Sequence, residues 1–332
     1  MELNWFCDKR RMYRMDNLPS YHSTYHYWKQ YQAFFPEEFR LGDHANPEEE
    51  WWESNGVHLH IDRLPAPESP IKILFIHGAG GNGRLLAPYA RMLQLRGYEV
   101  VSPDLPPYGL SYASSGTRLN YDLWIKLLVS LADREYRKDG KPIVALGSSI
   151  GGMLAYHTSA RSEYVQGLIV TTFVDTSDSD MRDQLAPNRL ISRWGKRMMD
   201  QFPGLLDRIR ISVKQVSRME LITNNSDLTR LIMNDPQAAA TRVPLELLRT
   251  FLNKKPEVNP EQFDQCPVLL VHPELEPMTP LRFSQSFFDR LKVEKECVVL
   301  EGAGHFPIEQ PGLNQLEEAV LRFLHKIQAK HS

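Results

Sequence analysis

The feature that most constrains the fold is an alternation of short apolar runs with longer segments of helical periodicity. The apolar runs have the length of buried strands and lie at residues 71–76, 98–102, 142–146, 165–171, 268–271 and 297–300. The helical segments lie at residues 84–96, 121–137, 150–160, 281–291 and 313–327. Parallel strands need long crossover connections, which are usually helices. The alternation therefore predicts an α/β fold with a mostly parallel sheet and helices on both faces.

A hairpin is predicted ahead of this alternating pattern. Residues 51–54 and 57–64 have strand character and are separated by Asn55 and Gly56. Asn-Gly between two strands is the strongest short signal for a tight antiparallel turn, because both residues tolerate positive φ. We therefore expect the sheet to begin with an antiparallel pair.

The alternation stops between residues 173 and 260. This stretch contains helical segments rich in Arg, Leu and Met, and we identify no strand in it. It is too long for an ordinary connection between two elements. The chain is therefore expected to have four parts, which are an N-terminal extension at residues 1–50, a first core part at 51–172, a helical cap or lid at 173–260 and a second core part at 261–332.

Aromatic residues crowd the first 50 residues. Tyr21, Tyr25, Trp28 and Phe35 recur at helical spacing, which predicts a helix with an aromatic stripe. The simplest interpretation is that this stripe packs on the body of its own chain. A contact in a homodimer and a wall of the substrate entrance are the alternatives.

Composition and charge exclude several classes of protein. Hydrophobic residues make up 42% and charged residues 24%, as in ordinary globular proteins, and a net charge of −2 offers no field for nucleic acid. Three cysteines without CxxC spacing predict neither a disulfide framework nor a zinc site. Since we find no run of eighteen apolar residues and no signal-like N-terminus, we expect a soluble cytoplasmic protein without stable membrane insertion.

The strand predicted at residues 142–146 runs directly into a GxSxG motif, at Gly147, Ser149 and Gly151. A serine between a strand and a helix has a strained backbone that pushes its hydroxyl above the sheet edge, and small neighbours let the turn close. The amides at the start of the helix face the charge that forms when the serine attacks. Ser149 is therefore the predicted nucleophile, and the amide of Ile150 is a predicted oxyanion donor.

The motif HGAGG at residues 77–81 follows the strand predicted at residues 71–76. In a hydrolase this loop supplies the second oxyanion donor, which we assign to the amide of Ala79. Losing one such donor typically costs a factor of about 10² to 10³ in turnover.

The same loop has a rival interpretation. Gly78, Gly80 and Gly83 spell GxGxxG, and Asp104 ends the next predicted strand, as in a dinucleotide-binding fold. An antiparallel hairpin is not expected ahead of that fingerprint. The fingerprint also leaves the GxSxG serine unexplained.

The motif GAGHFP at residues 302–307 follows the strand predicted at residues 297–300. A histidine between small residues in a loop at the sheet edge can reach the serine, accept its proton and return it to the leaving group. His305 is therefore the predicted general base. His157 and His272 are predicted to be ordinary packed side chains.

A third residue should orient the imidazole of His305. The loop after the strand at residues 268–271 contains Glu276, which has the expected place between serine and histidine in the chain. Glu274 lies two residues earlier, and Asp175 follows the preceding core strand, from which an acid can also reach the histidine. Glu276 is preferred, and the other two carboxylates stay open as alternatives.

Together these motifs resemble the α/β-hydrolase family. HGAGG, then DLPPYGLS at residues 104–111, then GSSIGG and GAGHFP stand in the family's order, and the resemblance covers residues 57–172 and 262–330. The chain departs from the family pattern in two places. Pro107 replaces a glycine of a turn, and in the acid loop Pro273 and Glu276 stand where a glycine and an aspartate are common.

The resemblance implies ester hydrolysis by acyl transfer through a serine, a histidine and an acid, without metal or organic cofactor. The motifs are similar to those of monoacylglycerol lipases and small-ester carboxylesterases, which implies a small-molecule ester with an apolar acyl group. The insertion would cover the serine as a lid, and its methionines would suit an acyl pocket: Met181, Met198, Met199, Met219 and Met233. A serine-dependent carbon–carbon bond hydrolase and a non-catalytic binding protein of the same fold are the alternatives.

Overall fold

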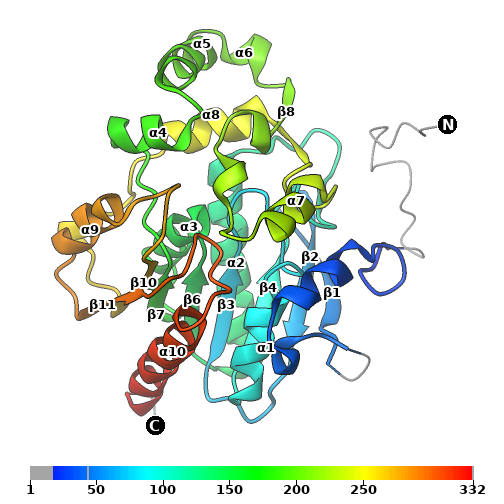
Figure 1. Ribbon diagram of the computed structural model, residues 1–332, viewed down its shortest axis with the longest axis vertical. Helices are drawn as coiled ribbons and strands as arrows, with labels where there is room; N and C mark the ends of the chain where they lie inside the picture. The colour runs from blue at the N-terminus through cyan, green and yellow to red at the C-terminus, as the bar shows by residue number, and fades with distance from the viewer. Residues whose placement is uncertain (1–17, 43–44, 331–332) are drawn as a thin grey trace.

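The computed structural model describes residues 18–42 and 45–330. Within these ranges the centre of the fold is a nine-stranded sheet (Figure 1) in the order β1-β2-β4-β3-β6-β7-β10-β11, with β5 beside β2. The strands are β1 (Glu48–Ser54), β2 (Val57–Leu64), β3 (Lys72–Ile76), β4 (Glu99–Pro103), β5 (Tyr112–Ala113), β6 (Ile143–Gly147), β7 (Val165–Val170), β10 (Val268–Pro273) and β11 (Lys295–Leu300). Neighbours from β4 to β11 are parallel, as the alternation predicts.

The sheet begins with the predicted antiparallel hairpin. β1 and β2 pair antiparallel in continuous register. Asn55 and Gly56 between them have φ angles of 51° and 72°, the two left-handed conformations that a two-residue type I′ turn requires. β2 also pairs antiparallel with β4, which joins the hairpin to the parallel strands.

Helices cover both faces of the sheet. They are α1 (Ala87–Leu95), α2 (Tyr121–Asp139), α3 (Ile150–Ser159), α9 (Leu281–Arg290) and α10 (Gly312–Ala329). α1 and α10 pack with Ile73 and Phe75 on one face, whereas α2, α3 and α9 pack with Leu74 and Ile76 on the other. Alternate side chains of a strand point to opposite faces of the sheet. Since helices cover both faces, every residue of β3 is buried. No helix of the described residues is both long and apolar enough to cross a bilayer.

Residues 173–260, which we call the insertion, lie over the C-terminal edge of the parallel strands (Figure 1). The insertion contains α4 (Ser179–Leu185), a π-helical turn (Ile191–Gly195), α5 (Lys196–Gln201), α6 (Pro203–Leu206), α7 (Ser226–Asn234), α8 (Leu245–Asn253) and short 3₁₀ helices at Val213–Gln215 and Met219–Leu221; another 3₁₀ helix, Pro260–Gln262, begins where it ends. The expectation that it lacks strands is wrong, because β8 (Arg210–Ser212) and β9 (Arg242–Pro244) form an antiparallel ladder. Strands this short show no periodicity, and their pairing is decided by tertiary contact.

The aromatic N-terminal segment packs on its own chain, as expected. Among its described residues, Tyr21, Trp28 and Phe35 are buried in the core. The expected helical stripe is only partly correct, because the structure has 3₁₀ helices at Tyr27–Phe34 and Glu37–Phe39 and a turn around Tyr21. The physical reason is a buried polar network that holds the chain at this turn.

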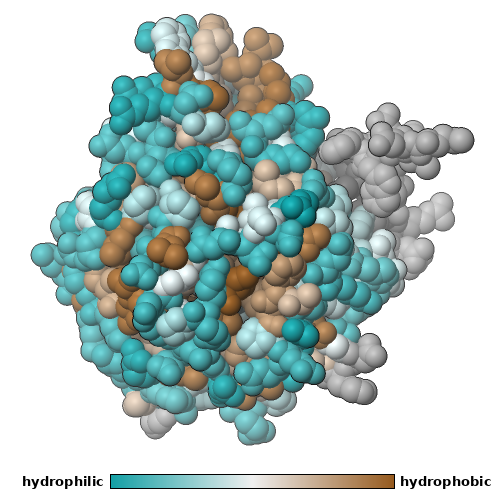
Figure 2. Space-filling model, in the orientation of Figure 1, coloured by the Kyte–Doolittle hydropathy of each residue, from teal (hydrophilic) through white to brown (hydrophobic). Residues whose placement is uncertain are grey.

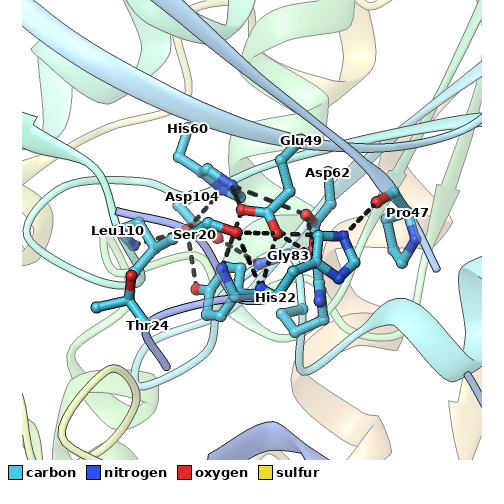
Figure 3. A network of polar contacts seen from close by, with 12 residues as sticks. Ser20, His22, Thr24, Pro47, Glu49, His60, Asp62, Gly83, Asp104 and Leu110 are labelled. Carbon is cyan, nitrogen blue, oxygen red and sulfur yellow. Dashed lines mark hydrogen bonds and ion pairs between the residues drawn. The ribbon is translucent and has the colours of Figure 1, made fainter. Parts of the chain in front are cut away.

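Buried charges join this segment to the hairpin (Figure 3). The Glu49 carboxylate accepts hydrogen bonds from the Ser20 hydroxyl at 2.9 Å and the Tyr21 amide at 3.0 Å, and it lies 3.0 Å from Nε2 of His60. Nδ1 of His60 lies 3.2 Å from the carboxylate of Asp104, which also accepts from the Tyr21 hydroxyl at 2.9 Å. Burial lowers the pKa of His60, but the two carboxylates outweigh burial and raise this pKa to about 9. The imidazole is therefore cationic at neutral pH.

A second cation, Arg84, joins the network, which then holds two cations and the three carboxylates of Glu49, Asp62 and Asp104. Its guanidinium is fully buried, donates to both oxygens of Asp62 at 2.6 and 2.8 Å, and lies 4.7 Å from the ring centre of Tyr21. Ligand-type atoms of Glu49, His60 and Asp62 lie within 4.8 Å of one another, a spacing that a metal ion can use. Because the carboxylates already pair with these two cations, the group is a buried ion network that ties the N-terminal segment to the sheet.

Candidate active site

Ser149 occupies the sharp turn between β6 and α3. Its φ of 56° and ψ of −127° lie outside the helix and strand regions, in a conformation that residues with a side chain rarely adopt. Its amide donates to the hydroxyl of Thr171, just after β7, at 3.0 Å. This is the strained strand-to-helix turn that the GxSxG spacing predicts, and such a turn raises the serine hydroxyl above the sheet edge.

The two motif glycines allow the start of α3 to approach the ends of β6 and β3. A Cβ on Gly147 would lie 2.1 Å from the carbonyl oxygen of Gly151, and a Cβ on Gly151 would lie 2.4 Å from the carbonyl oxygen of Ile76. Both obstacles are backbone atoms, which cannot rotate away as a flexible side chain can. The turn around Ser149 can therefore close only with glycine at these positions.

His305 and Glu276 come from separate loops and form a buried pair. His305 follows β11 and Glu276 follows β10, and Nδ1 of His305 lies 2.5 Å from Oε2 of Glu276. The other carboxylate oxygen accepts hydrogen bonds from the amides of Met278 at 2.7 Å and Thr279 at 2.9 Å. Burial raises the pKa of Glu276, but the adjacent His305 and these amides outweigh burial and hold this pKa below its ordinary value. An ionised, fixed carboxylate therefore faces the imidazole.

The two alternative acids have other partners. Glu274 is exposed and accepts a hydrogen bond from the amide of Gly302 at 2.8 Å. Asp175 accepts from the amide of Ser177 at 2.9 Å, within its own turn. Of the three carboxylates weighed from the sequence, Glu276 is the one that hydrogen-bonds to the histidine. Spacing along the chain cannot separate them, because the path of each loop decides which carboxylate turns inward.

One cavity between the sheet and the insertion brings most of the predicted residues together. Its volume is about 340 Å³, and Ser149 and His305 both line it. Ala79 and Ile150, which carry the two predicted oxyanion donors, line it as well. Glu276 reaches this site through its hydrogen bond to the histidine. Residues that are far apart in the chain thus face one space.

The insertion supplies much of the apolar wall of this cavity. Met198, Met199 and Met219 are among the lining residues, as expected for an acyl pocket. Met181 packs in the core instead, and Met233 packs at the edge of the other core cluster, so the expectation for these two methionines is wrong. Unbranched thioethers leave the wall adaptable in shape.

His77 holds the loop that carries Ala79, a role that the motif by itself does not reveal. The amide of Leu105 donates to Nε2 of His77 at 2.8 Å, so Nδ1 carries the proton and donates to the carbonyl oxygen of Gly78 at 2.7 Å. Burial lowers the pKa of His77, which keeps this imidazole neutral. The sequence feature that could have indicated this role is a histidine at the end of a buried strand, directly before the glycines of the loop.

The dinucleotide interpretation of the same loop is wrong. The Asp104 carboxylate is buried and accepts hydrogen bonds from the amides of Gly83 at 2.7 Å and Leu110 at 2.8 Å, so it is not available to a ribose hydroxyl. A Cβ on Gly83 would lie 2.5 Å from the carbonyl oxygen of Ser102. That glycine is required for close packing against β4.

His157 and His272 are packed side chains, as predicted. His157 lies in α3 against the ring of Tyr121, and burial lowers the pKa of His157 to about 4. Nδ1 of His272 in β10 lies 3.2 Å from the carbonyl oxygen of Thr171. Neither histidine lines the cavity.

Sequence comparison relates the chain to esterases and lipases. It is 33% identical to lipase LipV of Mycobacterium tuberculosis over 116 residues, which are 34% of this chain and 41% of the lipase. It is 25% identical to a pimeloyl-[acyl-carrier protein] methyl ester esterase of Xanthomonas oryzae pv. oryzae over 285 residues, which are 80% of this chain and 98% of the esterase. The chain thus spans less than half of LipV and nearly all of the methyl ester esterase.

Structure comparison finds the same fold, and a family sequence model identifies the family. A soluble variant of monoglyceride lipase from Saccharomyces cerevisiae, solved with a substrate analog, has a TM-score of 0.72 and 17% identity, covering 88% of this chain and 98% of the lipase chain. At that identity the likeness shows the fold alone. The model of the alpha/beta hydrolase family matches residues 73–313, from β3 into α10, which is well over half of the chain. The chain therefore belongs to the alpha/beta hydrolase family.

Proposed function

We propose that this protein is a serine hydrolase that cleaves a carboxylic ester, with Ser149 as nucleophile, His305 as general base and Glu276 as the acid that orients the imidazole. The observation that carries the proposal is that a strained serine turn and a buried histidine–carboxylate pair meet at one apolar cavity. A serine hydroxyl is a weak nucleophile by itself. A base and an orienting carboxylate are the groups that activate it.

In the first step the hydroxyl oxygen of Ser149 attacks the ester carbonyl carbon while His305 takes the hydroxyl proton. The carbonyl oxygen becomes an oxyanion and accepts hydrogen bonds from the amides of Ala79 and Ile150. Among the described residues, neither amide donates a hydrogen bond to a backbone oxygen in a turn, loop or helix cap. Both amides are therefore available to the oxyanion. Ile150 is the first residue of α3, so the helix dipole also favours the negative charge.

The tetrahedral intermediate then breaks down to the acyl-enzyme and the alcohol. The bond to the leaving alcohol breaks, and the protonated His305 returns its proton to the oxygen of that alcohol. The acyl group stays on Ser149 as an ester. A water molecule repeats the sequence, losing a proton to His305 as it attacks the acyl carbonyl, and the carboxylic acid leaves as Ser149 regains its proton.

The cavity supports an apolar acyl group as the substrate part that is bound. Its volume of about 340 Å³ falls in the range of small-ligand sites, and its walls are mostly aliphatic and thioether side chains. The insertion serves as the cap of this site in the proposal. The comparison with a lipase and a methyl ester esterase supports an ester as the bond that is cleaved.

A fluorophosphonate probe tests the nucleophile directly. The probe's phosphorus forms a bond to the serine oxygen and fluoride leaves, so an activated serine is labelled covalently. We expect labelling of the wild-type protein and none of Ser149→Ala, with the labelled peptide identified by mass spectrometry. Ser148→Ala is the matched control, because the neighbouring serine lacks the strained turn, and it should be labelled like wild type.

Other outcomes of this experiment separate the alternatives. Unchanged labelling of Ser149→Ala would refute the assignment of the nucleophile. Labelling of Ser149 without hydrolysis of any carboxylic ester would favour serine-dependent carbon–carbon bond cleavage. A folded wild-type protein that is not labelled would favour a non-catalytic binding protein.

A further inference from the structure

The outer surface of the insertion carries a row of exposed apolar side chains. They lie along residues 190–209 and include Leu190, Trp194, Phe202, Leu205 and Ile209, with the half-exposed Met198, which also lines the cavity, between them. Leu205, Leu190 and Trp194 are 74%, 70% and 63% exposed. Figure 2 shows apolar side chains gathered at the top of the molecule, where Figure 1 places α5 and α6. We call this surface the outer apolar face.

The inner side of the same stretch is apolar as well. Met199 and Leu206, together with the half-exposed Ile191 and Met198, line the cavity that also contains Ser149. A surface segment normally needs one apolar side and turns polar side chains to water on the other. The cavity accounts for the inner side. The outer apolar face therefore needs a cover of its own.

The outer apolar face lies in a strongly basic part of the chain. Residues 189–214 contain seven Lys or Arg side chains and two aspartates, a net charge of +5 in a chain whose total is −2. One of the aspartates, Asp207, is buried and accepts hydrogen bonds from Arg118 and Arg249, which lie outside this stretch. Its negative charge is thus balanced by residues outside the stretch. Arg193 pairs with Asp183 and Lys196 pairs with Asp200, whereas Arg197 and Arg208 are exposed cations of this surface.

The positive charge of residues 189–214 indicates which kind of surface covers the outer apolar face. A second copy of the chain would place two basic stretches against each other across a twofold axis, where like charges repel. An anionic lipid bilayer offers an apolar interior to Trp194 and Leu205 and phosphates to the exposed Arg197 and Arg208. We propose that the outer apolar face docks this protein on the surface of an anionic lipid bilayer.

Docking in this orientation sets the insertion between the lipid and the cavity. Neighbouring side chains of α6 then have separate environments, with Leu205 toward the lipid and Leu206 toward the cavity. An apolar acyl substrate would have a short path from the bilayer to Ser149. The docking itself uses no catalytic residue, so it stands independently of the proposed function.

Cosedimentation with lipid vesicles tests the proposal. The full chain is mixed with vesicles of pure phosphatidylcholine or of equal parts phosphatidylcholine and phosphatidylglycerol. We expect at least about tenfold tighter binding to the anionic vesicles, since each basic residue near such a surface adds about fivefold. High salt should remove most of this difference.

Variants assign the binding to the outer apolar face. Trp194→Ser with Leu205→Ser should weaken binding to anionic vesicles at least about tenfold, because both side chains lose their burial in lipid. Val299→Ser is the matched control, since Val299 is 44% exposed on the distant β11, and it should bind like wild type. Thermal unfolding of each variant checks its fold.

A further variant separates this proposal from the catalytic one. Ser149→Ala should bind vesicles like wild type even though it is expected to be inactive. Equal binding to neutral and anionic vesicles, or unchanged binding of the double serine variant, would overturn the proposal. Sedimentation velocity showing a dimer that the double variant dissociates would also overturn it and assign the face to a second copy. Capture by an acidic protein without any vesicle binding would assign it to a protein partner.

Discussion

The two oxygens of Glu276 have separate tasks. Oε2 faces Nδ1 of His305, and Oε1 accepts hydrogen bonds from the amides of Met278 and Thr279. Glutamate has one more rotatable bond than the aspartate that is common in this family, and flexibility would blur the position of the carboxylate. The two amides remove that freedom, so the longer acid can still orient the imidazole.

Replacing Glu276 with glutamine tests this role. In the proposed mechanism His305 accepts the serine proton, and a neutral amide could not stabilise the imidazolium that results. We expect kcat to fall by about 10³- to 10⁴-fold with KM little changed. Steady-state hydrolysis of a water-soluble nitrophenyl ester measures the effect.

Two other substitutions serve as matched controls for this experiment. Glu274→Gln and Asp175→Asn remove the alternative carboxylates without touching the hydrogen bond to His305. Both should keep the wild-type kcat. Loss of activity in Asp175→Asn together with normal activity in Glu276→Gln would show that Asp175 is the acid.

At the scale of elements, the N-terminal segment connects three parts of the molecule. The ring of Phe35 contacts the rings of Tyr89 in α1 and Phe306 beside the candidate histidine. The hydroxyl of Tyr27 donates to the carbonyl oxygen of Leu231 in α7 at 3.1 Å. The segment is therefore packed against both the core and the insertion, and the buried ion network fixes its start.

The ion network predicts how stability depends on pH. The pKa of His60 is about 9 in the folded protein, against an ordinary value of 6.5. Because the folded pKa is the higher one, this stabilisation is complete below about pH 6.5 and is lost as the pH rises through about 9. We expect the free energy of unfolding to fall by roughly 3 kcal/mol across this window. Urea denaturation at several pH values measures it.

A pair of histidine variants isolates this contribution. His60→Gln lowers stability at pH 6.5, because Glu49 and Asp104 lose their cationic partner, and it should flatten the fall between pH 6.5 and 9. His58→Gln, on the same strand but outside the network, should keep the wild-type pH dependence. A fall of the same size in His60→Gln would mean that another group titrates.

At the scale of the whole molecule, the cavity exists only because the core and the insertion close on each other. The core contributes Ser149, His305 and the loop that carries Ala79, and the insertion contributes apolar side chains of α5, α6 and α8. In the proposed function, chemistry and acyl recognition therefore come from different parts of the chain. Substitutions in the insertion should change which acyl groups are accepted without changing the chemical step.

Met199→Trp tests this division. Met199 lines the cavity from α5 and is buried, so the larger indole side chain of tryptophan at this position fills space that a long acyl chain would use. We expect kcat/KM for the nitrophenyl decanoate to fall by about tenfold or more. The acetate ester is the internal control and should be hydrolysed like wild type. Equal losses for both esters would show that the substitution disturbs the catalytic residues instead.

Local chemistry made several features predictable. Asn55 and Gly56 tolerate the positive φ angles of a tight hairpin turn, and the glycines around Ser149 permit a close approach of backbone to backbone. The parallel sheet follows from the alternation of strand and helix patterns. These are properties of a few neighbouring residues, and such residues behave similarly in many surroundings.

Other features depend on contacts between residues far apart in the chain, so only the structure reveals them. The ladder between β8 and β9 has strands of only three residues. The turn around Tyr21 exists because Glu49 accepts its amide hydrogen bond, and no pattern within the N-terminal segment reports that partner. The outer apolar face is likewise invisible in a sequence, because apolar residues at helical spacing read the same whether they meet a core or water.

By itself, the sequence determined the fold class and the identity of the serine and histidine candidates, because strand periodicity and turn geometry are local properties of the chain. Only the tertiary structure decided that Glu276, rather than Glu274 or Asp175, meets His305. It also decided which methionines face the cavity. The physical reason is that a side chain's partner depends on the path of loops and on the packing of distant elements, which are set by the whole chain at once.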